Sequence, residues 1–245
     1  KEELLNHMRK CWASLWTARA IFYREEQGFD HFQVSLSVVV QKMVNSEKSG
    51  VMFTANPVNG NRDEMMINAS WGLGEAVVSG AVTPDEFIVD KRTREIKETH
   101  IAEKTVMVVK KDEGIGTIEI KVGDCIGYEN VNRKCLSDEE ILKLIDFGLK
   151  IEELYGSHQD IEWGFDKETK ELYILQSRPI TTIKEDEKLE NKTESLELKS
   201  LVRGLAASPG IGMGKVKKIK DISEISRIEE GDVLVTVMTN PDMVP

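Results

Sequence analysis

Four polar side chains in the second half of the chain, Asp160, Glu162, Gln176 and Arg178, are of the types that bind a metal ion together with phosphate groups. Mg²⁺ takes oxygen ligands, usually one or two protein carboxylates with the remainder from substrate phosphates and water. An arginine guanidinium binds a phosphate through two parallel hydrogen bonds. We therefore interpret Glu162 and Gln176 as candidate metal ligands, Arg178 as a candidate phosphate ligand, and Asp160 as a metal ligand of second rank.

A predicted β-hairpin places these side chains on one face. Residues 159–166 and 171–181 alternate apolar and polar side chains around the polar turn Lys167–Lys170, and they are rich in β-branched and aromatic residues. Because strand side chains alternate between faces, Glu162 lies opposite Gln176 on the polar face. The alternative is an ordinary surface hairpin whose polar face is solvated, and spacing alone does not separate the two.

The start of the chain predicts one long helix followed by one strand. Apolar residues recur at the spacing of an amphipathic helix over residues 1–27, and Gly28 ends the pattern. Trp12 and Trp16 lie one turn apart, so we expect both on the buried face. Residues 33–44 alternate apolar and polar side chains, which predicts a strand with one buried face.

The middle of the chain predicts a meander of strands that leads into a well-capped helix. Turn residues separate short runs with strand character at 51–55, 65–69, 84–90, 94–97 and 105–109, with a further hairpin turn at 112–116. Ser137 and Glu140 have the spacing of a capping box, and an apolar stripe continues to Tyr155 before Gly156. We expect this helix to pack on the sheet.

The composition argues against several classes of function. The chain of 245 residues has 33 basic and 43 acidic side chains, a formal net charge of −10, which argues against a general nucleic-acid-binding surface. No apolar run approaches the ~18 residues that cross a membrane, and no leader pattern opens the chain, so we expect a cytoplasmic protein. Its three cysteines, Cys11, Cys125 and Cys135, lack the spacing of a zinc or redox site.

A change of composition predicts a domain boundary. Residues 184–200 are rich in charged side chains and poor in large apolar ones, which is typical of an interdomain linker. The glycine-rich run Ser208–Lys215 that follows continues as an alternating strand to Ile219. A phosphate-binding loop would continue as a helix, so we reject that interpretation of the run.

The hairpin residues Asp160–Trp163 and Leu172–Thr181 resemble the end of the ATP-binding domain in the family of phosphoenolpyruvate synthase and pyruvate phosphate dikinase. Other stretches match the same family in the same order, namely Cys11–Trp16, Gln41–Val44, Ser49–Pro57, Asn68–Phe87 and Gly204–Gly210. Ordered matches across nearly the whole chain are a much stronger signal than any single glycine-rich loop.

The resemblance implies an α+β fold. It implies an ATP-grasp-like domain with a mainly antiparallel sheet and flanking helices, followed by a partial β-rich swivelling domain. The C-terminal part of the ATP-binding domain would then occupy residues 1–183, the linker residues 184–200, and the start of the phosphohistidine domain residues 201–245.

The resemblance also implies ATP and Mg²⁺ as ligands. Backbone groups near Met43 and Val44 would read the edge of the adenine, and Gln41 would contact the nucleotide. Without the resemblance, Gln41 is a solvent-facing strand residue. The loop Trp71–Glu75 would lie near the nucleotide, with Glu75 a weak candidate for a ribose or metal contact, although tight packing of a turn explains it equally well.

The activity that the resemblance implies is transfer of a phosphoryl group from ATP to pyruvate, with Arg178 offsetting the developing charge. The family carries that group on a histidine in a Thr-x-x-x-His motif. None of the four histidines lies in such a motif; they are His7, His31, His100 and His158. We therefore expect a piece of a longer enzyme that binds nucleotide weakly and does not turn over by itself. The sequence is compatible with a homo-oligomer and does not determine the oligomeric state.

Three alternatives stay open from the sequence. A rifampin phosphotransferase has similar ATP-domain motifs, but there a drug-binding domain intervenes before a segment like Gly204–Gly210. Pyruvate phosphate dikinase uses phosphate where the synthase uses water, and no motif separates the two. A non-catalytic regulatory binding module is the alternative from another class, and the presence of Glu162, Gln176 and Arg178 argues against it.

Overall fold

The computed structural model of the chain describes residues 2–180, 211–220 and 222–236. The chain divides into two compact units: the sheet unit, residues 44–211, and the terminal unit, residues 1–43 with 212–245. The predicted linker at 184–200 lies outside the described residues, and the predicted domain limits stay a prediction.

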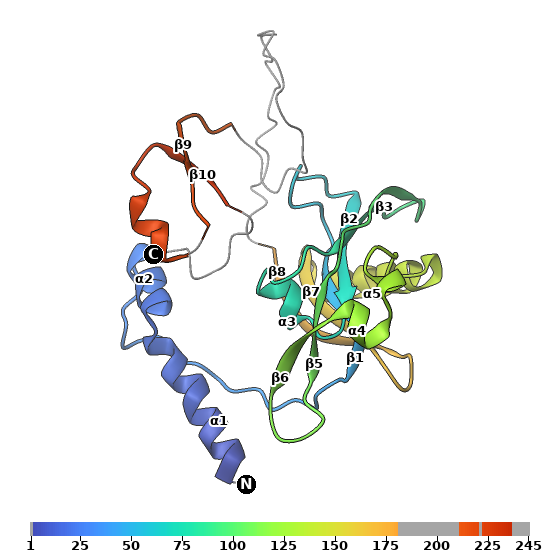
Figure 1. Cartoon of the computed structure of the whole chain (residues 1–245), viewed down its shortest axis with the longest axis horizontal. Helices are drawn as coiled ribbons and strands as arrows, with labels where there is room; N and C mark the ends of the chain where they lie inside the picture. The colour runs from blue at the N-terminus through green and yellow to red at the C-terminus, as the bar shows by residue number, and fades with distance from the viewer. Residues whose placement is uncertain (1, 181–210, 221, 237–245) are drawn as a thin grey trace. The chain divides into compact units, whose positions relative to one another are not determined.

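A six-stranded sheet organises the sheet unit, and every neighbouring pair of its strands is antiparallel (Figure 1). The strand order is β4 (Ile96–His100), β3 (Asp85–Asp90), β2 (Glu64–Trp71), β1 (Ser46–Phe53), β7 (Gln159–Asp166) and β8 (Leu172–Pro179). With the helices beside it, this sheet confirms the predicted α+β fold with a mainly antiparallel sheet.

Helix α5 (Asp138–Tyr155) packs against one face of this sheet and forms the main core with it. The helix begins where the sequence predicted: Ser137 Oγ accepts from the Glu140 amide, and the Glu140 carboxylate accepts from the Ser137 amide. Gly156 ends it in the left-handed region, at φ 65°. Burying a Leu or Ile side chain contributes roughly 1.5–3 kcal/mol. The fully buried members include Met52, Ile67, Phe87, Ile161 and Trp163 on the sheet and Ile141, Leu144 and Ile145 on the helix.

A second, two-stranded sheet follows the meander. Strands β5 (Val106–Lys110) and β6 (Thr117–Lys121) pair antiparallel around the predicted turn, and α4 (Val122–Ile126) and the short helix η2 (Tyr128–Asn130) continue from them. The short helix α3 (Glu75–Val78) follows β2 and contacts β5. Figure 1 shows this hairpin and α4 beside each other.

The start of the chain differs from the prediction of one continuous helix. Helix α1 (Glu2–Ala13) leads into a 3₁₀ turn, η1 (Ser14–Trp16), before α2 (Ala18–Glu26) begins. Thr17 is extended, at φ −70° and ψ 152°, and its hydroxyl accepts from the Ala20 amide, so it caps α2 and breaks the helix. Trp12 and Trp16 are about half exposed, at 48% and 51%, so the prediction that both are buried was wrong.

The predicted strand over 33–44 was also wrong. No strand is formed there, and β1 begins only at Ser46. The segment has the alternating pattern, but the described part of the chain offers it no neighbouring strand, and Val39 and Val40 are exposed. Alternating apolar and polar side chains suit a strand that is buried on one face, but a strand forms only where its backbone can pair with a neighbouring strand.

Near the other end of the chain, β9 (Lys215–Lys218) and β10 (Asp232–Val235) pair in parallel, with the 3₁₀ helix η3 (Ile222–Arg227) between them in sequence. The strand that was expected after the glycine run is therefore confirmed. No helix in the described ranges is long and apolar enough to span a membrane.

Candidate functional site

The β7–β8 hairpin has the predicted register at its polar pairs, and it is shifted by one residue nearer the turn. Glu162 pairs with Gln176, and Asp160 pairs with Arg178. The register shifts directly after Glu162, so that Trp163 pairs with Ile174 and both contribute to the core. The polar members of the two pairs therefore lie on the face of the sheet that points away from α5.

Glu162 and Gln176 together offer oxygen ligands that no group in the described part of the chain occupies. Glu162 is half-buried and Gln176 is exposed, and within the described ranges neither side chain makes a hydrogen bond or an ion pair. No group of three or more His, Cys, Asp and Glu in those ranges could hold a metal. One carboxylate and one amide suit a cation that also takes ligands from substrate phosphates, as Mg²⁺ does.

Asp160 and Arg178 are already engaged with each other. Arg178 Nε and Nη2 both lie 2.8 Å from Asp160 Oδ2. The Asp160 side chain is mostly buried, whereas the Arg178 side chain is 69% exposed. Asp160 thus orients the guanidinium, whose remaining N–H groups face solvent and can bind an anion. This geometry makes Asp160 an orienting residue more readily than a metal ligand.

The face that carries Glu162 continues across β1 to polar residues on β2 and β3, where the sequence predicted no site residues. Val51 on β1 lies between Glu162 on one side and Asn68 on the other, and Asn68 pairs in turn with Glu86. Asn68 Oδ1 is buried without a hydrogen-bond partner in the described ranges, as is Ser70 Oγ. Burial raises the pKa of the Glu86 carboxyl. The sequence did contain a sign of this face: Asn68 and Glu86 lie in two of the predicted strands, and Ser70 follows Asn68 at the next alternate position.

The predicted adenine contacts lie at the boundary between the two units. Gln41 and Met43 are exposed in the terminal unit, and Val44 begins the sheet unit, two residues before β1. Their contact with a nucleotide stays a prediction. Glu75 on α3 accepts a hydrogen bond from Thr117 Oγ1 at 2.7 Å, so its carboxylate ties α3 to β6.

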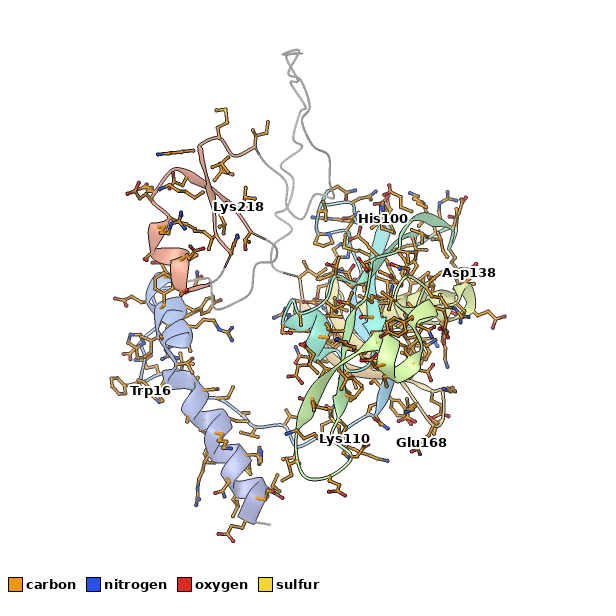
Figure 2. The ribbon with its side chains drawn as sticks, viewed as in Figure 1. Trp16, His100, Lys110, Asp138, Glu168 and Lys218 are labelled. Atoms are coloured by element: carbon orange, nitrogen blue, oxygen red, sulfur yellow. The ribbon has the colours of Figure 1, made fainter. Side chains whose placement is uncertain are left out.

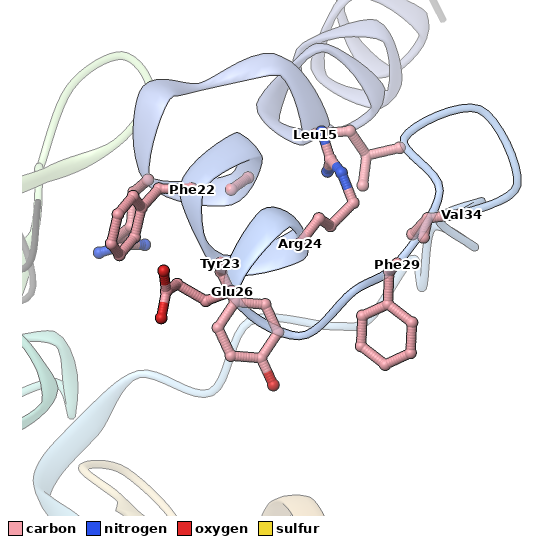
Figure 3. Close-up of a pocket in the computed structure, with 9 residues that line it drawn as sticks. Leu15, Phe22, Tyr23, Arg24, Glu26, Phe29 and Val34 are labelled. Atoms are coloured by element: carbon pink, nitrogen blue, oxygen red, sulfur yellow. The ribbon is translucent and has the colours of Figure 1, made fainter.

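A cavity of about 790 Å³ lies in the terminal unit (Figure 3). Its lining is mostly apolar and aromatic, with Phe22, Tyr23 and Phe29 from α2 and the loop after it. Glu26 is its one acidic lining residue. Arg19 and Arg24 also line it. The described lining holds no pair of a carboxylate and an amide like Glu162 and Gln176, so the hairpin face remains the candidate site.

The family model and the curated relatives that match this chain all point to one family. Residues 1–199 match the model of the pyruvate phosphate dikinase AMP/ATP-binding domain. The chain is 60% identical over 245 residues to the phosphoenolpyruvate synthase of Pyrococcus furiosus and 62% identical to a probable phosphoenolpyruvate synthase of Pyrococcus horikoshii. It is 52% identical to a probable phosphoenolpyruvate synthase of Methanocaldococcus jannaschii. These matches cover the whole chain but only 30%, 30% and 20% of the respective relatives.

Proposed function

The chain belongs to the family of the pyruvate phosphate dikinase AMP/ATP-binding domain, and on this premise we propose that it is the nucleotide-binding part of a phosphoenolpyruvate synthase. The whole enzyme would convert ATP, pyruvate and water into phosphoenolpyruvate, AMP and phosphate. The names of the relatives favour pyruvate over a drug as the acceptor. The observation that carries the proposal is the pairing of Glu162 with Gln176 on one hairpin face, where neither side chain has a partner among the described residues.

Glu162 and Gln176 would hold Mg²⁺, because their oxygens are of the type the ion prefers and have no partner in the described ranges. When bound, the ion supplies positive charge that neutralises the phosphates. Arg178 would bind a phosphate with the N–H groups that Asp160 leaves free. The protein's contribution is then positioning and charge neutralisation, which is most of what phosphoryl transfer requires.

The adenine contact is proposed on the likeness to the family alone. Gln41 would contact the nucleotide, and backbone groups near Met43 and Val44 would bind the edge of the base. Support comes from their place in the stretch Gln41–Val44, which lies inside the family match.

ATP and pyruvate are both cytoplasmic metabolites, so we propose that the enzyme acts in the cytoplasm.

We also propose the domain limits of 1–183 for the ATP-binding part and 201–245 for the start of a carrier domain, with a linker at 184–200. The family match ends at residue 199, which supports a boundary inside or just after the linker. The charged composition of residues 184–200 supports it independently.

The test is Glu162→Gln in a protein that spans the length of the relatives. Gln keeps the size and hydrogen-bonding capacity of the side chain but removes the negative charge that binds the metal. We expect pyruvate-dependent ATP consumption to fall on the order of 100-fold, since a metal ligand acts in the transition state as well as in binding.

The matched control is Glu168→Gln, which removes the same charge from the exposed turn of the same hairpin (Figure 2). We expect its activity to stay within about twofold of the parent protein, because surface substitutions away from a site change little. Equal activities of the two variants, with both folded, would contradict the assignment of Glu162.

A further inference from the structure

A cavity of about 1280 Å³ in the sheet unit takes part in nothing proposed above. The β5–β6 hairpin, α4, the start of β1 and the segment that leads into α5 form its walls. Figure 1 shows β5, β6 and α4 side by side, and Figure 2 marks Lys110 on the hairpin and Asp138 at the start of α5. A cavity of this size exceeds what a small metabolite needs.

One wall of the cavity is apolar because of how the hairpin pairs. Met107 pairs with Ile120 and Val109 with Ile118, so these four side chains share one face, and all four line the cavity. Ile118 is 48% exposed. Trp71 adds an aromatic surface, and its indole N–H already donates to the Asn130 carbonyl. The wall can therefore contact an apolar body.

The lining also has an excess of positive charge. Six cationic side chains line the cavity against three acidic ones, although the chain as a whole has a net charge of −10. Lys48 pairs with Glu140 and Lys134 pairs with Asp138. Four exposed cations have no ion pair within the described ranges: Lys110, Lys111, Arg133 and Lys167. A concave surface of one sign concentrates ions of the opposite sign.

This cavity is separate from the hairpin face that carries Glu162. Lys48 and Trp71 line the cavity, and in the sheet Lys48 pairs with both Trp71 and Phe165. Phe165 belongs to the core face, the side opposite to Glu162. A ligand in the cavity and a nucleotide on the hairpin would therefore lie on opposite faces of the sheet.

We propose that this cavity is a second ligand site, which binds a small organic anion with an apolar or aromatic body. The anionic group, a carboxylate, sulfonate or phosphate, lies among Lys110, Arg133 and Lys167, and the body packs on the β5–β6 wall. Guanidinium and ammonium groups give charge-assisted hydrogen bonds to such anions. The site does not depend on the nucleotide-binding proposal.

The test uses 1-anilinonaphthalene-8-sulfonate, an anion with an aromatic body, in fluorescence titrations of the 245-residue chain. The double substitution Lys110→Glu and Arg133→Glu reverses two exposed cations, and we expect it to weaken binding at least tenfold. Lys143→Glu reverses a lysine on the exposed surface of α5, outside the cavity lining, and should leave the affinity unchanged. N-phenyl-1-naphthylamine, which lacks the sulfonate, should bind the parent and the double variant equally.

A second readout locates the probe. Cys125 lines the cavity and is exposed, whereas Cys11 is exposed on α1 in the terminal unit. Saturating probe should slow the reaction of Cys125 with N-ethylmaleimide several-fold and leave Cys11 unchanged, as followed by peptide mass spectrometry. Binding that the charge reversal does not weaken, or that leaves Cys125 unprotected, would overturn the proposal. Loss of activity in Glu162→Gln would not bear on it.

Discussion

At the scale of single residues, surroundings separate side chains of the same type. Asp160 and Glu162 lie two positions apart on the same strand face, yet one carboxylate is engaged by Arg178 and the other has no partner in the described ranges. Arg178 takes one oxygen of Asp160, Oδ2, whereas both oxygens of Glu162 are without a partner in the described ranges. On this difference, and not on the acidic character that both share, we propose Glu162 as the metal ligand.

The three cysteines differ in the same way. Cys11 and Cys125 are exposed, whereas Cys135 is buried. Burial, together with the neighbouring Asp85 carboxylate, raises the pKa of the Cys135 thiol well above its usual value. Because the thiolate is the reactive form, a buried thiol with a raised pKa reacts slowly.

We therefore predict that N-ethylmaleimide at pH 7.5 modifies Cys135 at least ~100-fold more slowly than Cys11. The rates would be measured by peptide mass spectrometry on the folded chain. In a denaturing concentration of urea the three rates should converge, which serves as the control. Rapid modification of Cys135 in the folded chain would show that the segment before α5 opens readily.

At the scale of elements, one buried ion pair connects three segments of the sheet unit. The side chains of Asp85, at the start of β3, and Lys104, in the loop after β4, are completely buried and paired. The Asp85 carboxylate also accepts from the amides of Ala102 and Cys135. These bonds hold the β4–β5 loop and the segment before α5 against the end of β3.

We predict that Asp85→Leu lowers the free energy of unfolding by about 3–5 kcal/mol, because it leaves the Lys104 ammonium buried without a counter-ion, with only the Ala102 carbonyl as acceptor among the described residues. Adding Lys104→Met should recover much of the loss, since an apolar pair can replace a buried ion pair at little cost. Urea unfolding followed by circular dichroism measures both. If the double variant is no more stable than Asp85→Leu, the two residues do not act as a pair.

At the scale of the whole molecule, the pattern of carboxyl groups predicts how stability depends on pH. A hydrogen bond from the Thr93 amide, with help from Lys97, lowers the pKa of Asp90 to about 2. Burial by itself would raise the pKa of Glu64, Glu140 and Glu152, but hydrogen bonds from Asn56, Lys48 and Lys91 respectively, with other contacts, lower the pKa of all three. Glu86 is the opposite case, because burial raises its pKa.

A carboxyl with a lowered pKa in the folded state contributes stability above its unfolded pKa and loses it as the pH falls towards the folded value. The unfolded chain binds more protons in that window, so acid favours unfolding. We predict that the urea midpoint is constant from pH 7 to about 5 and then falls continuously towards pH 2. The measurement is urea unfolding of the 245-residue chain at a series of pH values.

Two variants test the sign. Asp90→Asn keeps an acceptor for the Arg92 and Thr93 amides but has no proton to gain, so it should reduce the loss of stability between pH 4 and 2. Glu86→Gln removes a charge that burial disfavours, so it should raise the midpoint at pH 7. A parent chain whose midpoint rises on acidification would contradict the interpretation.

The sequence by itself determined the features that depend on neighbours along the chain. The capping box of Ser137 and Glu140 fixes where α5 begins, and the turn at Asp166–Lys170 fixes the register of the hairpin. That turn sets the pairs as far as Trp163 with Ile174, because a shift of the strand by one residue would move its core face into solvent. The bulge directly after Glu162, which brings Gln176 opposite Glu162, was not predicted. The resemblance to the family rested on such stretches as well, and the family is confirmed.

Tertiary structure alone decided the features that depend on distant partners. The alternating segment 33–44 did not become a strand, because no strand in the described ranges pairs with it. Likewise, Asp85 and Lys104 became a buried pair only because the fold brings a strand end and a loop together. Pairing, burial and cavities result from contacts between residues far apart in sequence, which local spacing does not encode.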